Sequence, residues 1–388
     1  MAAPLLEWFE ANRRALPWRT EPRDPYRTWL SEVMAQQTRL DVVVPYFDRF
    51  VGRFPTLAAL AAAPLEEVLS LWSGLGYYAR ARNLHRAAQA AVARGGALPA
   101  TFAELSELPG FGPYTAAAVA SLAFGEDVPL VDGNVARVLA RVLRLPGDAA
   151  QVRPLALAVA ANLLPAGKAG PFNEALMELG ATVCTPRSPA CPACPLETLC
   201  AARAEGDPEA FPAAKPKKAR PELHWAGLAL RRADGRILVA RRPDGDLFAG
   251  LWELPSAPVA LDAPAADAVA AIAACHALPS GCAADVRPAG EVAQTLTHRQ
   301  VTLRLFSARL HGTGGPPSES LRWVEPTQAG LGALGISSLA AKALKAVGIA
   351  PPQRPRKETA SAAGRLTGSA AARRPPSSKR RSARRELP

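Results

Sequence analysis

Four cysteines near the middle of the chain constrain its fold more than any other feature. They follow the spacing Cys184-x6-Cys191-x2-Cys194-x5-Cys200. Four thiolates within 17 residues can surround one compact metal centre, and the prolines between them keep the segment non-helical. Zinc ribbons favour two C-x2-C pairs far apart, whereas here one such pair is flanked by single cysteines. The spacing therefore favours a 4Fe-4S cluster, with a four-cysteine zinc site as the alternative and unligated thiols last.

The charge of the chain is concentrated at one end. The 388 residues carry a formal net charge of +12, and 388 residues suggest two or three domains. The segment 351–388 holds eleven Lys and Arg against two Glu, which leaves +3 for the rest. Nucleic-acid binding must therefore be inferred from local features rather than from net charge.

The chain shows no signal for export or membrane insertion. Its first residues lack a basic segment followed by an apolar core, and no long uninterrupted apolar run is present. We therefore expect a cytoplasmic protein, in which clustered cysteines more often bind metal than form disulfides.

Changes in composition divide the chain into four parts. Apolar residues recur at helical spacing through residues 1–203, and a Pro- and Lys-rich linker is expected at 204–221. Strand-like segments joined by turn signals predict a smaller α+β domain at 222–347. The remainder, 348–388, is expected to be a disordered basic tail that either keeps the protein soluble or binds DNA.

Residues 108–116 join two helical patterns through a glycine-containing turn. Gly110 and Gly112 permit a tight hairpin whose exposed N–H groups, with the start of the next helix, can bind a phosphate oxygen. A plain helix–helix turn is the simpler interpretation. The prediction gains weight because Asp132 follows 18 residues after Tyr114, directly before another helical pattern.

Several longer stretches strengthen this interpretation. The segments 16–19, 29–38, 71–84 and 172–180 closely resemble the MutY family of A/G-specific adenine DNA glycosylases, which are helix-hairpin-helix enzymes. The resemblance covers nearly all of residues 5–201, and the cysteine spacing is similar to that of endonuclease III and adenine glycosylases. It implies a mainly α N-terminal glycosylase region with an iron–sulfur loop, followed by a smaller α+β MutT/Nudix-like domain.

The resemblance implies that two carboxyl groups perform the chemistry. Glu32 would protonate adenine at N7, and Asp132 would stabilise the positively charged sugar or bond to it transiently. Glu32 needs a raised pKa for this task, which burial among apolar neighbours would provide. Taken alone, Glu32 could be a solvated helix carboxylate and Asp132 a helix N-cap.

Further residues of the active site are implied by the same resemblance. Tyr114 and Asn134 would hold Asp132 and the attacking water, and Arg19 and Glu174 would support the site. Glycosylases that also cut the strand carry a lysine at the position of Tyr114, where the amine forms a Schiff base. A phenol cannot form one, which favours a monofunctional enzyme.

Two residues of the helical region match the family's DNA wedge. Gln37 and Tyr77 correspond to residues that insert into the duplex near the lesion. Tyr77 could instead be a core aromatic, but its glycine-rich surroundings favour contact with DNA.

The second domain resembles the part of the family that recognises 8-oxoguanine opposite adenine, with 250–255 as the matching stretch. The glutamates with which a Nudix hydrolase binds Mg²⁺ are absent from 265–274, so pyrophosphate hydrolysis is not expected. The family's lesion-reading Phe-Ser-His is replaced by Leu296, Thr297 and His298, so the stacking of the aromatic ring is lost.

The predicted function is removal of adenine mispaired with 8-oxoguanine or guanine in double-stranded DNA, within base excision repair. The enzyme alternative is an endonuclease III-type pyrimidine glycosylase and lyase. The non-enzyme alternative is a lesion-binding protein without activity, which retention of Glu32 and Asp132 disfavours. We expect a monomer in the bacterial cytoplasm, associated with the nucleoid through DNA.

Overall fold

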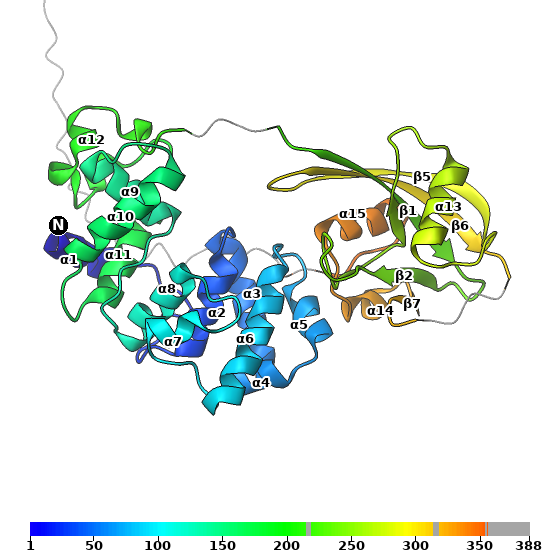
Figure 1. Cartoon of the computed structure of the whole chain (residues 1–388), viewed down its shortest axis with the longest axis horizontal. Coiled ribbons are helices and arrows are strands. Elements are labelled where there is room, and N and C mark those ends of the chain that lie inside the picture. The colour runs from blue at the N-terminus through cyan, green and yellow to red at the C-terminus, as the bar shows by residue number, and fades with distance from the viewer. Residues whose placement is uncertain (215–218, 313–317, 354, 356–388) are drawn as a thin grey trace, which may run out of the picture.

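The computed structural model describes residues 1–214, 219–312, 318–353 and 355. Helices occupy the N-terminal half, and a β-rich domain follows at the other end of the molecule (Figure 1). None of the helices within these ranges is both long and apolar enough to cross a membrane.

The N-terminal half consists of helices joined by short loops. Their bounds are α1 Ala2–Asn12, α2 Pro25–Ala35, α3 Leu40–Arg53, α4 Leu57–Ala62, α5 Leu65–Trp72, α6 Ala79–Gly95, α7 Phe102–Ser106, α8 Pro113–Phe124, α9 Gly133–Leu143, α10 Ala149–Leu163, α11 Ala169–Thr182 and α12 Ala201–Ala204. Local chemistry explains where they begin: the Asp24 carboxylate accepts hydrogen bonds from the N–H groups of Tyr26 and Arg27, and Pro25 takes the first helical position of α2.

These helices form two lobes with separate apolar cores. The first core gathers side chains of α2 to α6, including Trp29, Phe50 and Trp72. The second gathers side chains of α1 and α9 to α11, including Leu5 and Phe172. Helix α8 contributes alanines to both cores, so it ties the lobes together and fixes the cleft between them.

The segment after α11 remains packed against the second lobe as far as Ala213, beyond residue 204 where the sequence predicted the start of a linker. It forms short 3-10 turns at Cys191–Ala193, Glu197–Leu199 and Pro208–Ala210. Arg141 donates a hydrogen bond to the carbonyl of Phe211, and the N–H of Ala213 donates to the carbonyl of Gly147. The linker expected from residue 204 is thus wrong for its first ten residues, because these backbone contacts were not visible as a sequence pattern.

The C-terminal domain is a mixed β-sheet with a helix on each face. Its strands are β1 Glu222–Arg231, β2 Ile237–Arg241, β3 Trp252–Glu253, β4 Ser256–Pro258, β5 Ala283–Thr295, β6 Gln300–Leu310 and β7 Leu321–Val324. The strand order is β3-β2-β1-β6-β5, with β1 and β6 parallel and the other pairs antiparallel; β4 pairs with β1 and β7 with β2.

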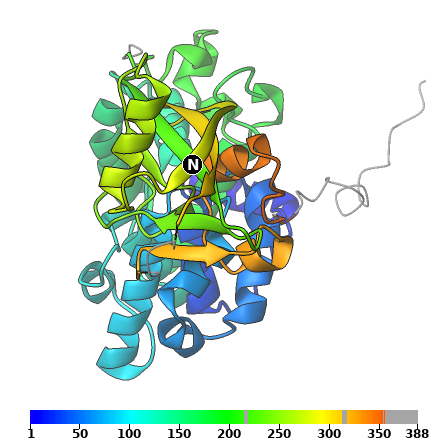
Figure 2. The same ribbon diagram turned by 90° about the vertical axis from the view of Figure 1, so that its right-hand side faces the viewer.

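Helices α13 (Ala265–Cys275) and α15 (Ser338–Ala346) lie on opposite faces of this sheet, and the short α14 spans Gln328–Gly332 (Figure 2). The ordered domain extends past residue 347, since Ile349 is buried and the Pro351 carbonyl accepts a hydrogen bond from Gln328. The start of the predicted disordered tail at 348 is therefore too early, and its basic part beyond 355 lies outside the described residues.

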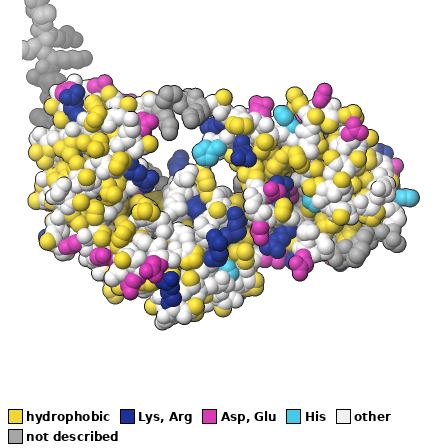
Figure 3. Space-filling view, in the orientation of Figure 1, with side chains coloured by type: hydrophobic (Ala, Val, Ile, Leu, Met, Phe, Trp, Pro, Cys, Tyr) yellow, Lys and Arg dark blue, Asp and Glu magenta, His cyan; other side chains and the backbone are white. Residues whose placement is uncertain are grey.

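The C-terminal domain contacts the first lobe at the loop between α5 and α6. The Ser73 hydroxyl donates to the Ile336 carbonyl at 2.5 Å and accepts from the Ile336 N–H at 3.1 Å. Ser70 donates to the Gly332 carbonyl, and Glu66 pairs with Arg322. Between the domains the surface is hollowed, with Lys and Arg side chains along the edges of the hollow (Figure 3).

Candidate active site and DNA-binding cleft

The cleft between the lobes brings most of the predicted site residues together. It has a volume of about 1410 Å³, larger than ordinary small-molecule pockets. The predicted residues that line it come from both lobes: Arg19, Glu32, Gln37, Gly110, Gly112, Tyr114, Asp132, Asn134 and Glu174. Tyr77 and the Leu296–His298 turn lie outside this lining set.

Glu32 lies near the C-terminal end of α2 and is only 9% exposed. The hydroxyl of Tyr114 on α8 donates to its Oε2 at 2.7 Å. The pKa of Glu32 is raised to about 7, chiefly by burial and in smaller part by the carboxylates of Glu174 and Asp132, while the Tyr114 hydrogen bond and the Arg19 charge oppose the rise. A carboxyl group with this pKa can hold a proton near neutral pH and donate it.

Asp132 caps helix α9. Its Oδ1 accepts a hydrogen bond from the Val135 N–H at 2.7 Å, and its Oδ2 accepts one from the Asn134 side chain at 2.9 Å. Burial raises the pKa of Asp132, and these hydrogen bonds together with Arg137 lower it in part. Asp132 is therefore an N-cap and also lines the cleft, so the two interpretations of its sequence position are compatible.

One partner differs from the expectation. Tyr114 was expected to hold Asp132 together with Asn134, but its hydroxyl donates to Glu32, and the Asn134 side chain donates to Asp132. The reason is the position of α8, which directs the ring toward α2. Tyr114 thus contacts Glu32 rather than Asp132.

A buried ion-pair network lies beside Glu32. The Arg19 guanidinium donates to Glu174 at 2.8 Å and to Glu178 at 2.9 Å, with both carboxylates almost fully buried. Arg14 pairs with Glu178 and Arg23 with Glu174. Burial raises the pKa of Glu178, but the hydrogen bonds from Arg14 and Arg19 outweigh it and bring the pKa below its usual range.

The sequence reasoning missed three members of this network: Arg14, Arg23 and Glu178. Glu178 was detectable, because it follows Glu174 by four residues and therefore shares its face of α11. The arginines precede α2 in irregular backbone and carry no such signal.

Arg137 links helix α9 to the cysteine loop. Its guanidinium donates to the Asn134 side-chain oxygen at 2.9 Å and to the backbone carbonyls of Cys184 and Gly180, both at 2.8 Å. Asn134 in turn donates to Asp132. The orientation of Asp132 therefore depends on contacts that reach the first cysteine of the loop.

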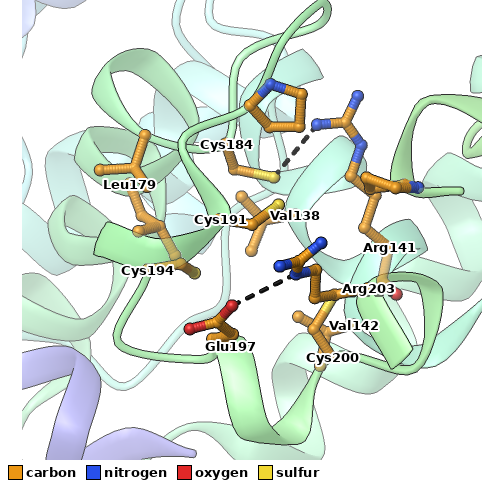
Figure 4. Close-up of a pocket in the computed structure, with 13 residues that line it drawn as sticks. Val138, Arg141, Val142, Leu179, Cys184, Cys191, Cys194, Glu197, Cys200 and Arg203 are labelled. Carbon is orange, nitrogen blue, oxygen red and sulfur yellow. Dashed lines mark hydrogen bonds and ion pairs between the residues drawn. The ribbon is translucent and has the colours of Figure 1, made fainter. Parts of the chain in front are cut away.

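The four cysteines surround one pocket against α9 and α11 (Figure 4). Arg141, a fully buried residue of α9, donates to the Cys184 sulfur at 3.4 Å and to the carbonyls of Thr185 and Pro186. Among the described residues, no three His, Cys, Asp or Glu side chains converge tightly enough for a single metal ion.

The predicted hairpin joins α7 to α8. Gly110 has a φ of +79°, and a Cβ there would lie 2.5 Å from the Asn83 Cβ, so both backbone and space require glycine. Gly112 has an ordinary φ of −80° and caps α8. Of the two glycines, Gly110 alone is required by the turn, while Gly112 places the start of α8 at the cleft.

Gln37 and Tyr77 share an unusual backbone. Both lie in the left-handed region, with φ of 57° and 50°, which non-glycine residues rarely adopt. Tyr77 is 44% exposed, which excludes a core role. Its hydroxyl lies 2.7 Å from the Thr297 hydroxyl, in the turn between β5 and β6 that carries Leu296 and His298.

Comparison with known proteins identifies the class. The family model for the HhH-GPD superfamily of base excision DNA repair proteins matches residues 30–158, and a NUDIX domain model matches residues 226–346. The chain thus combines a helix-hairpin-helix DNA repair fold with a Nudix-like domain, which confirms the predicted fold class.

Curated relatives define the family more closely. Human adenine DNA glycosylase is 35% identical over 383 residues, covering 82% of this chain and 69% of the human protein. The mouse adenine DNA glycosylase is also 35% identical, covering 83% of this chain and 73% of its own length. Among solved structures, a thermostable thymine-DNA glycosylase is 30% identical with a TM-score of 0.48, covering 53% of this chain and 95% of that protein. The chain belongs to the adenine DNA glycosylase family.

Proposed function

We propose that this protein removes adenine from double-stranded DNA by hydrolysing its N-glycosyl bond, and that adenine opposite 8-oxoguanine or guanine is its substrate. The observation that carries this proposal is the pairing of Glu32 and Asp132 across one cleft, in a member of the adenine DNA glycosylase family.

The two carboxyl groups divide the chemistry. Glu32, whose pKa burial raises to about 7, donates its proton to N7 of the extruded adenine and improves the leaving group. Asp132 lies where its carboxylate can stabilise the positive charge that develops on the sugar. The N-glycosyl bond then breaks and adenine leaves, water adds to the positively charged sugar and loses a proton that replaces the one Glu32 gave, and an abasic site remains.

The absence of an amine nucleophile defines the product. Tyr114 occupies the position where strand-cleaving relatives carry lysine, and its hydroxyl is engaged by Glu32. Hydrolysis without a Schiff base therefore leaves the strand intact. Borohydride trapping on abasic DNA tests this point: little adduct is expected, and a strong covalent adduct would overturn it.

Recognition of the opposite base is assigned to the turn between β5 and β6. Thr297 and His298 are exposed there, and the Thr297 contact with Tyr77 puts this turn beside the predicted wedge. The hydroxyl and imidazole can hydrogen-bond an oxidised guanine, and Leu296 packs into the domain core instead of stacking. We expect hydrogen bonding to replace the missing aromatic contact.

A single-turnover assay over A:8-oxoG, A:G, A:C and T:G duplexes tests the function. Adenine release from the first two and none from T:G is expected, and pyrimidine release would favour the endonuclease III-type alternative. Glu32→Gln should bind the A:8-oxoG duplex without releasing adenine, whereas Glu10→Gln, an exposed carboxyl on α1, should behave as wild type. Normal excision by Glu32→Gln would overturn the assignment of the acid.

We also propose that Cys184, Cys191, Cys194 and Cys200 hold a 4Fe-4S cluster. Their side chains surround one pocket, and the buried Arg141 beside Cys184 offsets the negative charge of thiolates. The spacing of the four cysteines, with one C-x2-C pair flanked by single cysteines, suits a cluster better than zinc. The cluster would cross-link the loop and thereby support α9, which carries Asp132.

Iron and acid-labile sulfide analysis of anaerobically purified protein tests the cofactor. About four of each per chain is the expected result for such a cluster. Stoichiometric zinc without sulfide would contradict it.

A further inference from the structure

Arg80 joins the two loops that carry Gln37 and Tyr77. One loop connects α2 to α3, and the other connects α5 to α6, where Arg80 lies in the first turn of α6. The Arg80 residue is only 9% exposed, so its guanidinium is enclosed by these loops.

The guanidinium satisfies backbone groups on both sides. Its Nη1 donates to the carbonyls at the end of α2, those of Val33 and Met34 at 2.8 Å each and that of Gln36 at 2.6 Å. Its Nη2 donates to the Thr38 hydroxyl at 3.1 Å and to the Gly76 carbonyl at 3.2 Å. The bonded residues directly flank Gln37 on one side and precede Tyr77 on the other.

Two aromatic rings, that of Trp72 at the end of α5 and that of Tyr77 in the following loop, complete the enclosure. The Arg80 guanidinium carbon lies 5.3 Å from the Tyr77 ring centroid and 5.4 Å from that of Trp72, both within cation–π range. Burial lowers the pKa of Arg80 to about 10, so the group stays charged at neutral pH.

This arrangement has a geometric consequence. Gln37 and Tyr77 both hold a left-handed backbone that their side chains disfavour, and such conformations persist when surrounding contacts determine them. Arg80 supplies contacts to both segments through one rigid, planar group. A lysine carries the charge but lacks the planar fork, so it cannot reach both segments at once.

We propose that Arg80 is a positioning residue that sets the spacing of Gln37 and Tyr77 as a two-part wedge in the DNA duplex. The inference rests on the proposed function, since it takes both residues to enter the DNA. Because its guanidinium is buried and bonded to the two loops, Arg80 would act on the DNA through Gln37 and Tyr77. Its contacts with Val33 and Met34 also fix the end of α2, one residue beyond Glu32, so the wedge and the acid share one support.

The test compares two substrates that differ only in how much unstacking the enzyme must perform. One is an A:G duplex with paired flanks, and the other carries the same adenine between flanking mismatches that already disrupt stacking. Single-turnover excision and the fluorescence of a neighbouring 2-aminopurine are measured for Arg80→Lys, Arg80→Met and wild type. Arg94→Met, which removes an exposed arginine from the same helix, is the matched control.

We expect both Arg80 variants to lose about tenfold or more in rate on the paired duplex, with a reduced 2-aminopurine signal, since unstacking costs a few kcal/mol. On the disrupted duplex the loss should be within about threefold, because little unstacking remains to be done. If Arg80→Met folds poorly, Arg80→Lys carries the comparison because it retains the charge.

Equal losses on both substrates would overturn the proposal, since they would indicate general damage to the fold or to Glu32. Unchanged rates on both would also overturn it. Tyr77→Ala tests the wedge role of Tyr77 independently of Arg80: if that variant unstacks DNA normally, the wedge assignment itself fails. If Tyr77→Ala is defective while the Arg80 variants are not, the failure belongs to Arg80 alone.

Discussion

Replacing Tyr114 by phenylalanine removes the hydrogen bond that stabilises the ionised form of Glu32. The bond is 2.7 Å long and joins a phenol to a buried carboxylate, and it lowers the Glu32 pKa against the effect of burial. A hydrogen bond to a charged group contributes about 1.5–3 kcal/mol. Since one pKa unit corresponds to about 1.36 kcal/mol, Tyr114→Phe should raise the Glu32 pKa by about one to two units.

The assay is the pH dependence of kcat/KM for adenine release, which reports ionisations of the free enzyme. The reaction needs Glu32 protonated, so the wild-type rate should fall as pH rises through about 7. In Tyr114→Phe this decline should begin at about pH 8–9, because the raised pKa keeps the proton on Glu32.

Tyr26→Phe is the matched control, since it removes a buried phenol that bonds the Phe54 carbonyl rather than a carboxyl of the site. Its pH profile should match wild type. The reasoning is refuted if the alkaline decline of Tyr114→Phe stays at the wild-type position or moves to lower pH.

Three further predictions concern stability, each measured by urea unfolding. The pKa of Glu32 is raised from 4.5 to about 7 in the folded state, so ionisation of this carboxyl destabilises the fold as pH rises. The free energy of unfolding of Glu32→Gln should therefore exceed that of wild type by up to about 3 kcal/mol at about pH 9 and by little at about pH 4. A difference independent of pH would contradict this. The pKa of Glu178 is lowered in the folded state, so the stabilisation from its ion pairs is present above its unfolded pKa and is lost in acid. Glu178→Gln should lower the free energy of unfolding by about 3 kcal/mol near pH 7 and by less in acid. An equal loss at both pH values would count against the ion pairs. Ser73→Ala removes the hydroxyl that bonds both the N–H and the carbonyl of Ile336, and it should lower the free energy of unfolding by about 1–3 kcal/mol. No measurable loss would show that this interdomain contact contributes little to stability.

Features set by local sequence were the most predictable. The hairpin at 108–116 follows from a turn that needs glycine at Gly110, and the start of α9 follows from the capping side chain of Asp132. Helix α13 likewise follows from local sequence, because Pro264 directly precedes a run of strong helix formers from Ala265 to Cys275. Family resemblance then supplied roles that local sequence leaves open.

Features set by tertiary packing were not predictable in the same way. Strand β5 could not be predicted from its own residues, because it contains small residues and proline, is mostly exposed, and has register shifts at Ala284–Arg287 and Pro288–Gly290. Its pairing with β6 defines it, and pairing is not visible in one strand's composition. The ion pairs of Glu178 and the partner of Tyr114 likewise depend on helices that meet only in the folded chain.

The roles proposed for Glu32 and Asp132 follow from what surrounds each carboxyl group. Both are buried, and burial raises the pKa of both. Asp132 receives two hydrogen bonds at the start of a helix and lies near the charge of Arg137, all of which favour its ionised form. Glu32 receives one hydrogen bond and lies near two other carboxylates, which favour its protonated form. Because the negative charge of Asp132 raises the pKa of Glu32, a proton in this site is held more stably on Glu32, which leaves Asp132 free to stabilise a cation.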